Sequence, residues 1–256
     1  MARSHPLTRF WLSLLLTATS FAVPRDEARY IRLSTPGTHL VEGTPLGNGR
    51  LGATLFGGVS DERIVLNESG MWSGSPQEAD RPDAHRALPE IRRLLLAGRN
   101  HEAEQLVNAH FTCAGAGSGH GRGAKVPYGS YQVLGSLRLR FTAADAQAPV
   151  ANYERTLDLA DAIARISYMQ EGVKFTSEAF VSQPDEALLL RLSADRPGRI
   201  SFDARLERPE RASVSTAAGG LELRGQLNDG RQGDQGVRFA ARLAVRNTGG
   251  TVTVEG

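Results

Sequence analysis

The chain has 256 residues, of which 40% are hydrophobic and 23% are charged, and it contains 28 glycines and 12 prolines. This length suits one large domain or two small ones, and the composition excludes a wholly disordered, fibrous or collagen-like chain. The formal net charge of +2 resides in Arg3 and Arg9, because removing these two from 30 basic residues leaves 28 against 28 acidic ones; an anionic partner such as nucleic acid is therefore not indicated.

Residues 1–22 are typical of a signal peptide. Arg3 and Arg9 form a basic segment without acids, residues 10–16 are mostly apolar, and Ser20 and Ala22 provide small residues at the spacing of a cleavage site. The apolar run is shorter than the roughly 18 to 20 residues that a membrane-spanning helix needs. We therefore expect export to the periplasm or the extracellular space, no stable membrane span, and a mature domain over residues 23–256.

Between residues 50 and 112 the sequence predicts two strands and two helices. Residues 52–58 and 62–66 read as strands joined by a turn. Pro89 can open a helix that ends at Gly98, and Asn100 can cap a second helix with an apolar face that ends at Phe111. Together the two helices form a hairpin at about residues 84–111, which we expect to pack on a sheet.

Beyond residue 130 the sequence is dominated by strand signals. Apolar and polar side chains alternate over residues 136–141, 200–206, 221–223, 237–245 and 251–254. Turn-forming pairs such as Glu171-Gly172 and Gly219-Gly220 separate the strand-like segments. The predicted fold is mainly β: an antiparallel β super-sandwich with the short helical hairpin as an excursion.

Several familiar sites fail on spacing. The glycine-rich stretch of residues 115–125 ends in Ala124-Lys125-Val126, whereas a phosphate-binding loop needs Gly before the Lys and Ser or Thr after it. His101-Glu102 begins like a zinc-protease helix, but Gln105 stands where the second histidine is required. Cys113 has no partner for a disulfide and no evident activating group. No metal site, cofactor or nucleophilic triad is predicted.

Asn67, Glu68 and Trp72 are the best candidates for contact with a ligand. An amide, a carboxylate and an indole can together hydrogen-bond the hydroxyl groups of a sugar and stack on its face. The alternative is that Asn67 and Glu68 cap a turn and that Trp72 belongs to the core. The carboxylates are too numerous for the sequence to show which two could flank a glycosidic bond.

The order of several motifs resembles the amino-terminal domain of glycoside hydrolase family 95, known mainly for inverting α-L-fucosidases. The motifs that carry the resemblance occupy residues 44–53, 56–59, 62–64, 66–68, 72–74, 81–84, 88–92, 127–128, 134–135 and 153–159. The resemblance covers roughly residues 40 to 210, which is far more specific than any single motif.

This resemblance implies that the chain is a β-sandwich preceding a catalytic (α/α)6 barrel that it does not contain. The general-acid glutamate, and the asparagine and aspartate that activate water, belong to that barrel in the family, so no catalytic residue is assigned to this chain. The implied substrate is a fucosylated oligosaccharide or glycan. Asn48, Asn67, Glu68 and Trp72 are then candidates for the rim of the substrate pocket or for contact with the barrel. A related α-L-galactosidase-type hydrolase and a free-standing, non-catalytic carbohydrate-binding sandwich remain as alternatives.

Overall fold

A computed structural model of the chain describes residues 29–74, 80–112, 129–142, 145, 147–230 and 235–255. The predicted signal peptide, residues 1–22, lies outside the described residues. So do Cys113 and the glycine-rich stretch of residues 115–125. Among the described residues, no helix is both long and apolar enough to cross a membrane.

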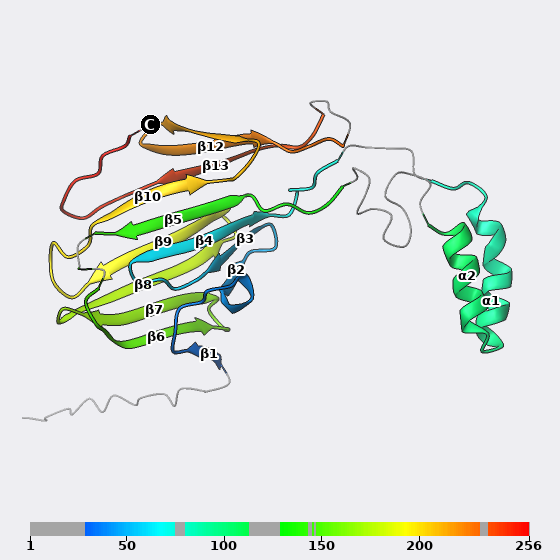
Figure 1. The fold of residues 1–256 in the computed structure, drawn as a ribbon, viewed down its shortest axis with the longest axis horizontal. Helices are drawn as coiled ribbons and strands as arrows, with labels where there is room; N and C mark the ends of the chain where they lie inside the picture. The colour runs from blue at the N-terminus through cyan, green and yellow to red at the C-terminus, as the bar shows by residue number, and fades with distance from the viewer. Residues whose placement is uncertain are drawn as a thin grey trace, which may run out of the picture.

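Two five-stranded antiparallel sheets form the body of the molecule (Figure 1). The first sheet has the strand order β1 (Tyr30–Leu33), β6 (Val150–Asp158), β7 (Ile163–Gln170), β8 (Val173–Ser182) and β9 (Ala187–Ala194). The second sheet has the order β10 (Phe202–Glu207), β5 (Gly135–Phe141), β4 (Asp61–Glu68), β3 (Leu51–Leu55) and β2 (Thr44–Gly47). A third sheet contains β11 (Ala212–Ala217), β12 (Gly220–Gln226) and β13 (Arg238–Ala244).

The two five-stranded sheets share one apolar core, which makes the fold a sandwich. Ile64 of β4 and Leu137 of β5 belong to the same buried cluster as Ala164 and Ile166 of β7, and Leu223 of the third sheet joins it. Burial alternates along β7, where every second residue from Ala164 to Gln170 is buried, because successive side chains point to opposite faces of a strand. The predicted class, a mainly β antiparallel sandwich, is therefore confirmed.

The predicted helical hairpin is also present. It comprises a 3-10 turn (Ala84–Ala87), α1 (Leu88–Leu96) and α2 (Asn100–His110). Pro89 lies in the first turn of α1, and Gly98, with a φ of +70°, follows its end as expected. The expected cap at Asn100 is wrong, because Asn100 is already helical and no side chain caps α2.

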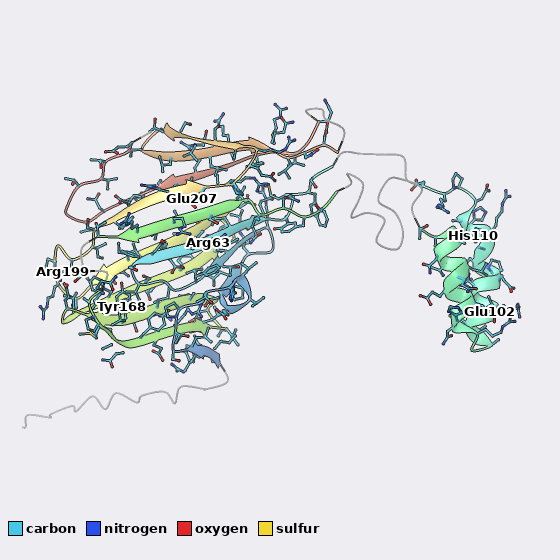
Figure 2. All side chains as sticks on the ribbon, viewed as in Figure 1. Arg63, Glu102, His110, Tyr168, Arg199 and Glu207 are labelled. Atoms are coloured by element: carbon cyan, nitrogen blue, oxygen red, sulfur yellow. The ribbon has the colours of Figure 1, made fainter. Side chains whose placement is uncertain are left out.

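The hairpin does not pack on the sheets, contrary to our expectation. Figure 1 shows α1 and α2 apart from the three sheets, and in Figure 2 Glu102 and His110 lie far from Arg63 of β4. The hairpin instead buries Ile91 and Leu94 of α1 against Ala103 of α2. A small core of its own thus replaces the expected contact with a sheet.

The strand predictions are confirmed for most of the second half of the chain. β5, β10, β12 and β13 fall where the alternating patterns indicated. Residues 251–254 are the exception, because they form no strand although their sequence alternates. Val252 and Val254 are both exposed, so this alternation does not reflect one buried and one wet face.

A buried polar cluster ties the two main sheets together at the start of β4. The Glu62 carboxylate accepts hydrogen bonds from the backbone amides of Phe56 and Gly58 in the loop between β3 and β4. From the facing sheet, Tyr153 donates to the carbonyl of Gly57 at 2.7 Å, and the Arg155 guanidinium donates to the carbonyls of residues 55 and 56. The loop is thus held by side chains of both sheets, and we call this group the Glu62 cluster.

Candidate functional site

Strand pairing brings the four predicted residues to one end of the second sheet. Asn48 lies in the turn between β2 and β3, while Asn67 and Glu68 end β4 and are followed by Trp72. The antiparallel register pairs Leu51 with Glu68 and Gly52 with Asn67. The β2–β3 turn therefore lies beside the end of β4, and residues separated by about twenty positions in the sequence become neighbours.

Asn48 holds the β2–β3 turn and ties it to the facing sheet. Its Oδ1 accepts hydrogen bonds from the backbone amides of Arg50 at 2.9 Å and Leu51 at 2.7 Å. Its Nδ2 donates to the carbonyl of Ser182, at the end of β8, at 2.9 Å. Gly49 has a φ of +93°, a conformation that side-chain-bearing residues rarely adopt. Both ends of the Asn48 amide are thus engaged within the chain, and its role is to position the turn.

Glu68 is also engaged by neighbouring groups. The Arg50 Nε donates to Glu68 Oε1 at 3.0 Å, and the other carboxylate oxygen accepts from the backbone amide of Gly70 at 2.7 Å. Arg50 also donates to Glu186, in the turn between β8 and β9. Hydrogen bonds to these two carboxylates raise the pKa of the Arg50 guanidinium. Glu68 therefore caps a turn, as the alternative interpretation anticipated, while it lies beside the aromatic residues.

Trp72 is not part of the core. Its side chain is 51% exposed, and an isolated antiparallel bridge pairs it with Tyr131, which is 45% exposed. The two ring centroids lie 5.7 Å apart with their planes inclined at 68°. Trp72 Nε1 donates to the carbonyl of Ser69 at 3.1 Å, and the Tyr131 hydroxyl donates to Oδ1 of Asn67 at 3.3 Å. We call this pair the aromatic corner.

Tyr131 is the residue that sequence reasoning missed. It lies 59 positions after Trp72 and follows a glycine-rich stretch, so no local pattern links the two rings. Partial burial raises the pKa of the Tyr131 hydroxyl, and the nearby Glu68 carboxylate raises it further. The hydroxyl therefore remains protonated at neutral pH and can act as a donor. The sequence feature that could have indicated a strand at Tyr131 is the alternation of Tyr131 and Val133 with polar residues, which is typical of a short strand.

A polar pocket lies on the opposite side of the short ladder that Trp72 and Tyr131 form. Ser73 and Gln132 are among its lining residues, together with Arg211 and Asn228, and its volume is about 210 Å³. Gln132 Nε2 donates to the Ser130 hydroxyl at 3.0 Å, and the hydroxyls of Ser73 and Ser130 lie 3.2 Å apart. Because successive side chains alternate, these polar groups face away from the aromatic corner.

Glu62 has a raised pKa but cannot act as a general acid on a ligand. Burial raises the pKa of its carboxyl group to about 7, while hydrogen bonds from the backbone of residues 56–58 and the positive charge of Arg155 oppose the shift. A raised carboxyl pKa is a common property of catalytic acids. However, Glu62 is only 4% exposed and the loop amides surround its oxygens. It therefore serves the packing of the two sheets.

The candidate site offers binding groups rather than a catalytic pair. Inverting hydrolysis of a glycoside requires two carboxyl groups about 6.5 to 9.5 Å apart on either side of the bond to be cleaved. Here Glu68 and Glu186 are both held by the same arginine, Arg50. Within the described ranges, no group of three or more His, Cys, Asp and Glu side chains could hold a metal ion. The exposed rings and the surrounding polar groups are suited to contact with a ligand or with another domain.

Comparison with known proteins gives one family match. Residues 31–256 match the sequence model described as "Glycosyl hydrolase family 65, N-terminal domain". The match begins in β1 and covers all three sheets, so it refers to the sandwich described above.

Three curated relatives are also similar to the chain, over 69% to 90% of its length. "Alpha-L-fucosidase 2" of Arabidopsis thaliana is 31% identical in an alignment of 256 positions that covers 90% of this chain and 28% of the relative. "Probable alpha-fucosidase A" of Aspergillus niger is 28% identical over 69% of this chain and 21% of its own length. The protein of the same name from Aspergillus oryzae is 25% identical over 74% of this chain and 25% of its own length. The matched regions thus span about a quarter of the length of these relatives.

Proposed function

The chain belongs to the family of glycosyl hydrolase family 65 N-terminal domains, and from this premise we propose that it is the amino-terminal domain of an α-L-fucosidase-like enzyme of glycoside hydrolase family 95. The observation that carries the proposal is that all three curated relatives above have α-fucosidase names and match 69% to 90% of this chain. The proposed reaction is hydrolysis of terminal fucosyl linkages in oligosaccharides or glycans.

In this proposal the parent protein performs the chemistry outside the present chain. A barrel domain supplies the acid that protonates the leaving oxygen and the groups that direct water to the opposite face of the fucose ring. Two properties of the described residues favour this division. Glu68 and Glu186 share one arginine, and the carboxyl group with a raised pKa, Glu62, is enclosed.

The role proposed for the sandwich is to border the substrate pocket. Asn48 fixes the β2–β3 turn, and Asn67, Glu68 and Trp72 lie beside it at the same end of the second sheet. Trp72 is half exposed with its indole N–H already bonded to Ser69, so about half of its surface is available to a substrate or to the barrel. We propose this end as the surface that faces the catalytic domain and its glycan.

We also propose that the parent enzyme is exported. Residues 1–22 carry the basic, apolar and small-residue segments of a signal peptide. Mass spectrometry of the protein recovered outside the cytoplasm tests this, since export through this peptide predicts a new amino terminus at residue 23. A protein that retains residues 1–22 and stays in the cytoplasm would contradict it.

The full-length parent enzyme tests the function directly. We expect it to release fucose from 2′-fucosyllactose, with inversion at the anomeric carbon detected by NMR. Trp72→Ala is expected to lower kcat/KM by about two- to tenfold, since aromatic contacts contribute about 0.5–1.5 kcal/mol beyond area burial and 1.36 kcal/mol is a factor of ten. Trp72→Phe, which keeps an aromatic ring, is the matched control.

Two outcomes would contradict parts of this proposal. An unchanged kcat/KM for a correctly folded Trp72→Ala enzyme would exclude Trp72 from the substrate rim. Hydrolysis of α-L-galactosides with no release of fucose would exclude the fucosidase assignment and favour the galactosidase alternative.

A further inference from the structure

Trp72 and Tyr131 are the two most exposed aromatic side chains among the described residues, at 51% and 45%. Large aromatic side chains usually bury most of their surface, and exposed ones that lie together commonly mark a binding site. Their planes, inclined at 68° with centroids 5.7 Å apart, form two walls of a corner. A ligand in this corner can contact the face of one ring and the edge of the other.

Hydrogen bonds at the polar edges hold both rings in place. The indole N–H donates to the Ser69 carbonyl, and the phenol donates to the Asn67 side chain. The backbone bridge between Trp72 and Tyr131 fixes the spacing of the two residues. Because these bonds lie in the ring planes, they leave the exposed faces available. The corner is therefore preorganised, which lowers the entropic cost of binding.

The groups beside the aromatic corner are planar and polar. The Nδ2 of Asn67 has no hydrogen-bond partner within the described part of the chain, while its Oδ1 is bonded to Tyr131. Arg50 bridges the carboxylates of Glu68 and Glu186, so these three groups carry one positive and two negative charges. The excess negative charge disfavours an anionic ligand. The amide of Asn67, with a donor still available, suits a ligand that presents hydroxyl groups.

We propose that the aromatic corner is a saccharide-binding site for a neutral pyranose ring of a glycan. Such a ring has an apolar C–H face that stacks on Trp72 or Tyr131, and hydroxyls that reach the side-chain amide of Asn67. The bound ring is the sugar to which the fucosyl unit is attached. Only this identification of the glycan rests on the proposed function. It assigns to this chain a binding activity of its own and adds Tyr131 to the site.

The chain provides a direct optical test. Trp11 and Trp72 are its two tryptophans, so in a Trp11→Phe background the indole emission reports on Trp72. We expect lactose and 2′-fucosyllactose to change this emission saturably, with millimolar dissociation constants typical of a single-ring contact. Methyl α-L-fucoside alone should bind more weakly, because it lacks the ring that occupies the corner.

Two variants at Tyr131 and one at Gln132 separate the aromatic corner from the polar pocket behind it. Tyr131→Ala should weaken binding by about tenfold, while Tyr131→Phe should retain most of the affinity because it keeps the ring. Gln132→Ala, on the opposite side of the same ladder, should leave the affinity unchanged. Circular dichroism of each variant verifies the fold.

The absence of a saturable change with either oligosaccharide would overturn the inference. An equal loss in Gln132→Ala and Tyr131→Ala would also overturn it, because the ligand would then not lie on the aromatic side. If the parent enzyme releases fucose while this chain binds no saccharide, the inference is overturned and the proposed function still stands. Saccharide binding by this chain, with a parent enzyme that releases no fucose, supports the inference and contradicts the proposed function.

Discussion

We expect Glu62→Gln to remove a pH dependence of stability that the unsubstituted chain shows between pH 4.5 and about 7. In the folded chain, burial raises the pKa of the Glu62 carboxyl group from 4.5 to about 7. Below pH 4.5 the carboxyl group is protonated in both the folded and the unfolded states, and stability is fully present. As the pH rises to 7, the unfolded chain releases the proton that the folded chain retains, so stability is lost.

The size of the effect follows from the same two values. At about 1.36 kcal/mol for each pH unit, the interval from 4.5 to about 7 corresponds to a loss of about 3 kcal/mol in the free energy of unfolding. Above pH 7 the group is ionised in both states and the loss is complete. Glutamine cannot ionise, so the variant should lack this slope. It should also be about 1–3 kcal/mol less stable at pH 5, because its NH2 group faces a loop amide N–H where a carboxyl oxygen of Glu62 accepts a hydrogen bond.

Urea unfolding followed by circular dichroism at several pH values between 4.5 and 8.5 measures the slope. Glu154→Gln is the matched control, because Glu154 lies on β6 with its side chain 49% exposed and bonded to Arg32. This control should retain the slope of the unsubstituted chain. If Glu62→Gln kept the same pH dependence as the control, the slope would not arise from Glu62 and the reasoning would be refuted.

Two further substitutions test the packing of the sandwich. Ile64→Ala should lower the free energy of unfolding by about 2–5 kcal/mol, because Ile64 is fully buried in the core shared by both main sheets; a loss below 1 kcal/mol in the urea midpoint analysis would contradict this. Tyr153→Phe should cost about 0.5–1.5 kcal/mol through loss of the hydrogen bond to the Gly57 carbonyl, and unchanged stability in the same assay would show that this bond does not hold the loop.

The sequence was sufficient to predict the sandwich because most of its strands have one buried and one solvated face. β5 and β10 alternate apolar residues with arginine or aspartate. In the structure the two strands pair so that apolar residues lie opposite each other, as Leu139 does with Ala204. Residues 251–254 show where alternation fails to predict a strand. The same alternation occurs there, but both valines are exposed, since a period of two describes a strand only when a core covers one face.

The candidate site was predicted in part because most of its residues are close together in the sequence. Asn67, Glu68 and Trp72 lie within six residues of one another, and a hairpin register suffices to bring Asn48 close to them. Tyr131 reaches Trp72 through a single bridge across 59 positions, which no local pattern encodes. The burial of Glu62 was likewise not predicted. Its position two residues before Ile64 places it on the buried face, but the sequence does not show that the backbone amides of Phe56 and Gly58 bind its carboxyl group there.

The Glu62 cluster and the aromatic corner lie at opposite ends of the same strand. Asn67 lies five positions after Glu62 along β4, which corresponds to roughly 17 Å at about 3.3 Å per residue. Glu62 faces the first sheet, while Asn67, an odd number of positions away, points to the other face. Substitutions this far apart without shared partners act independently. We therefore expect the titration of Glu62 to change the stability of the sandwich without displacing Asn67 or the rings, so that stability and the proposed saccharide binding vary independently.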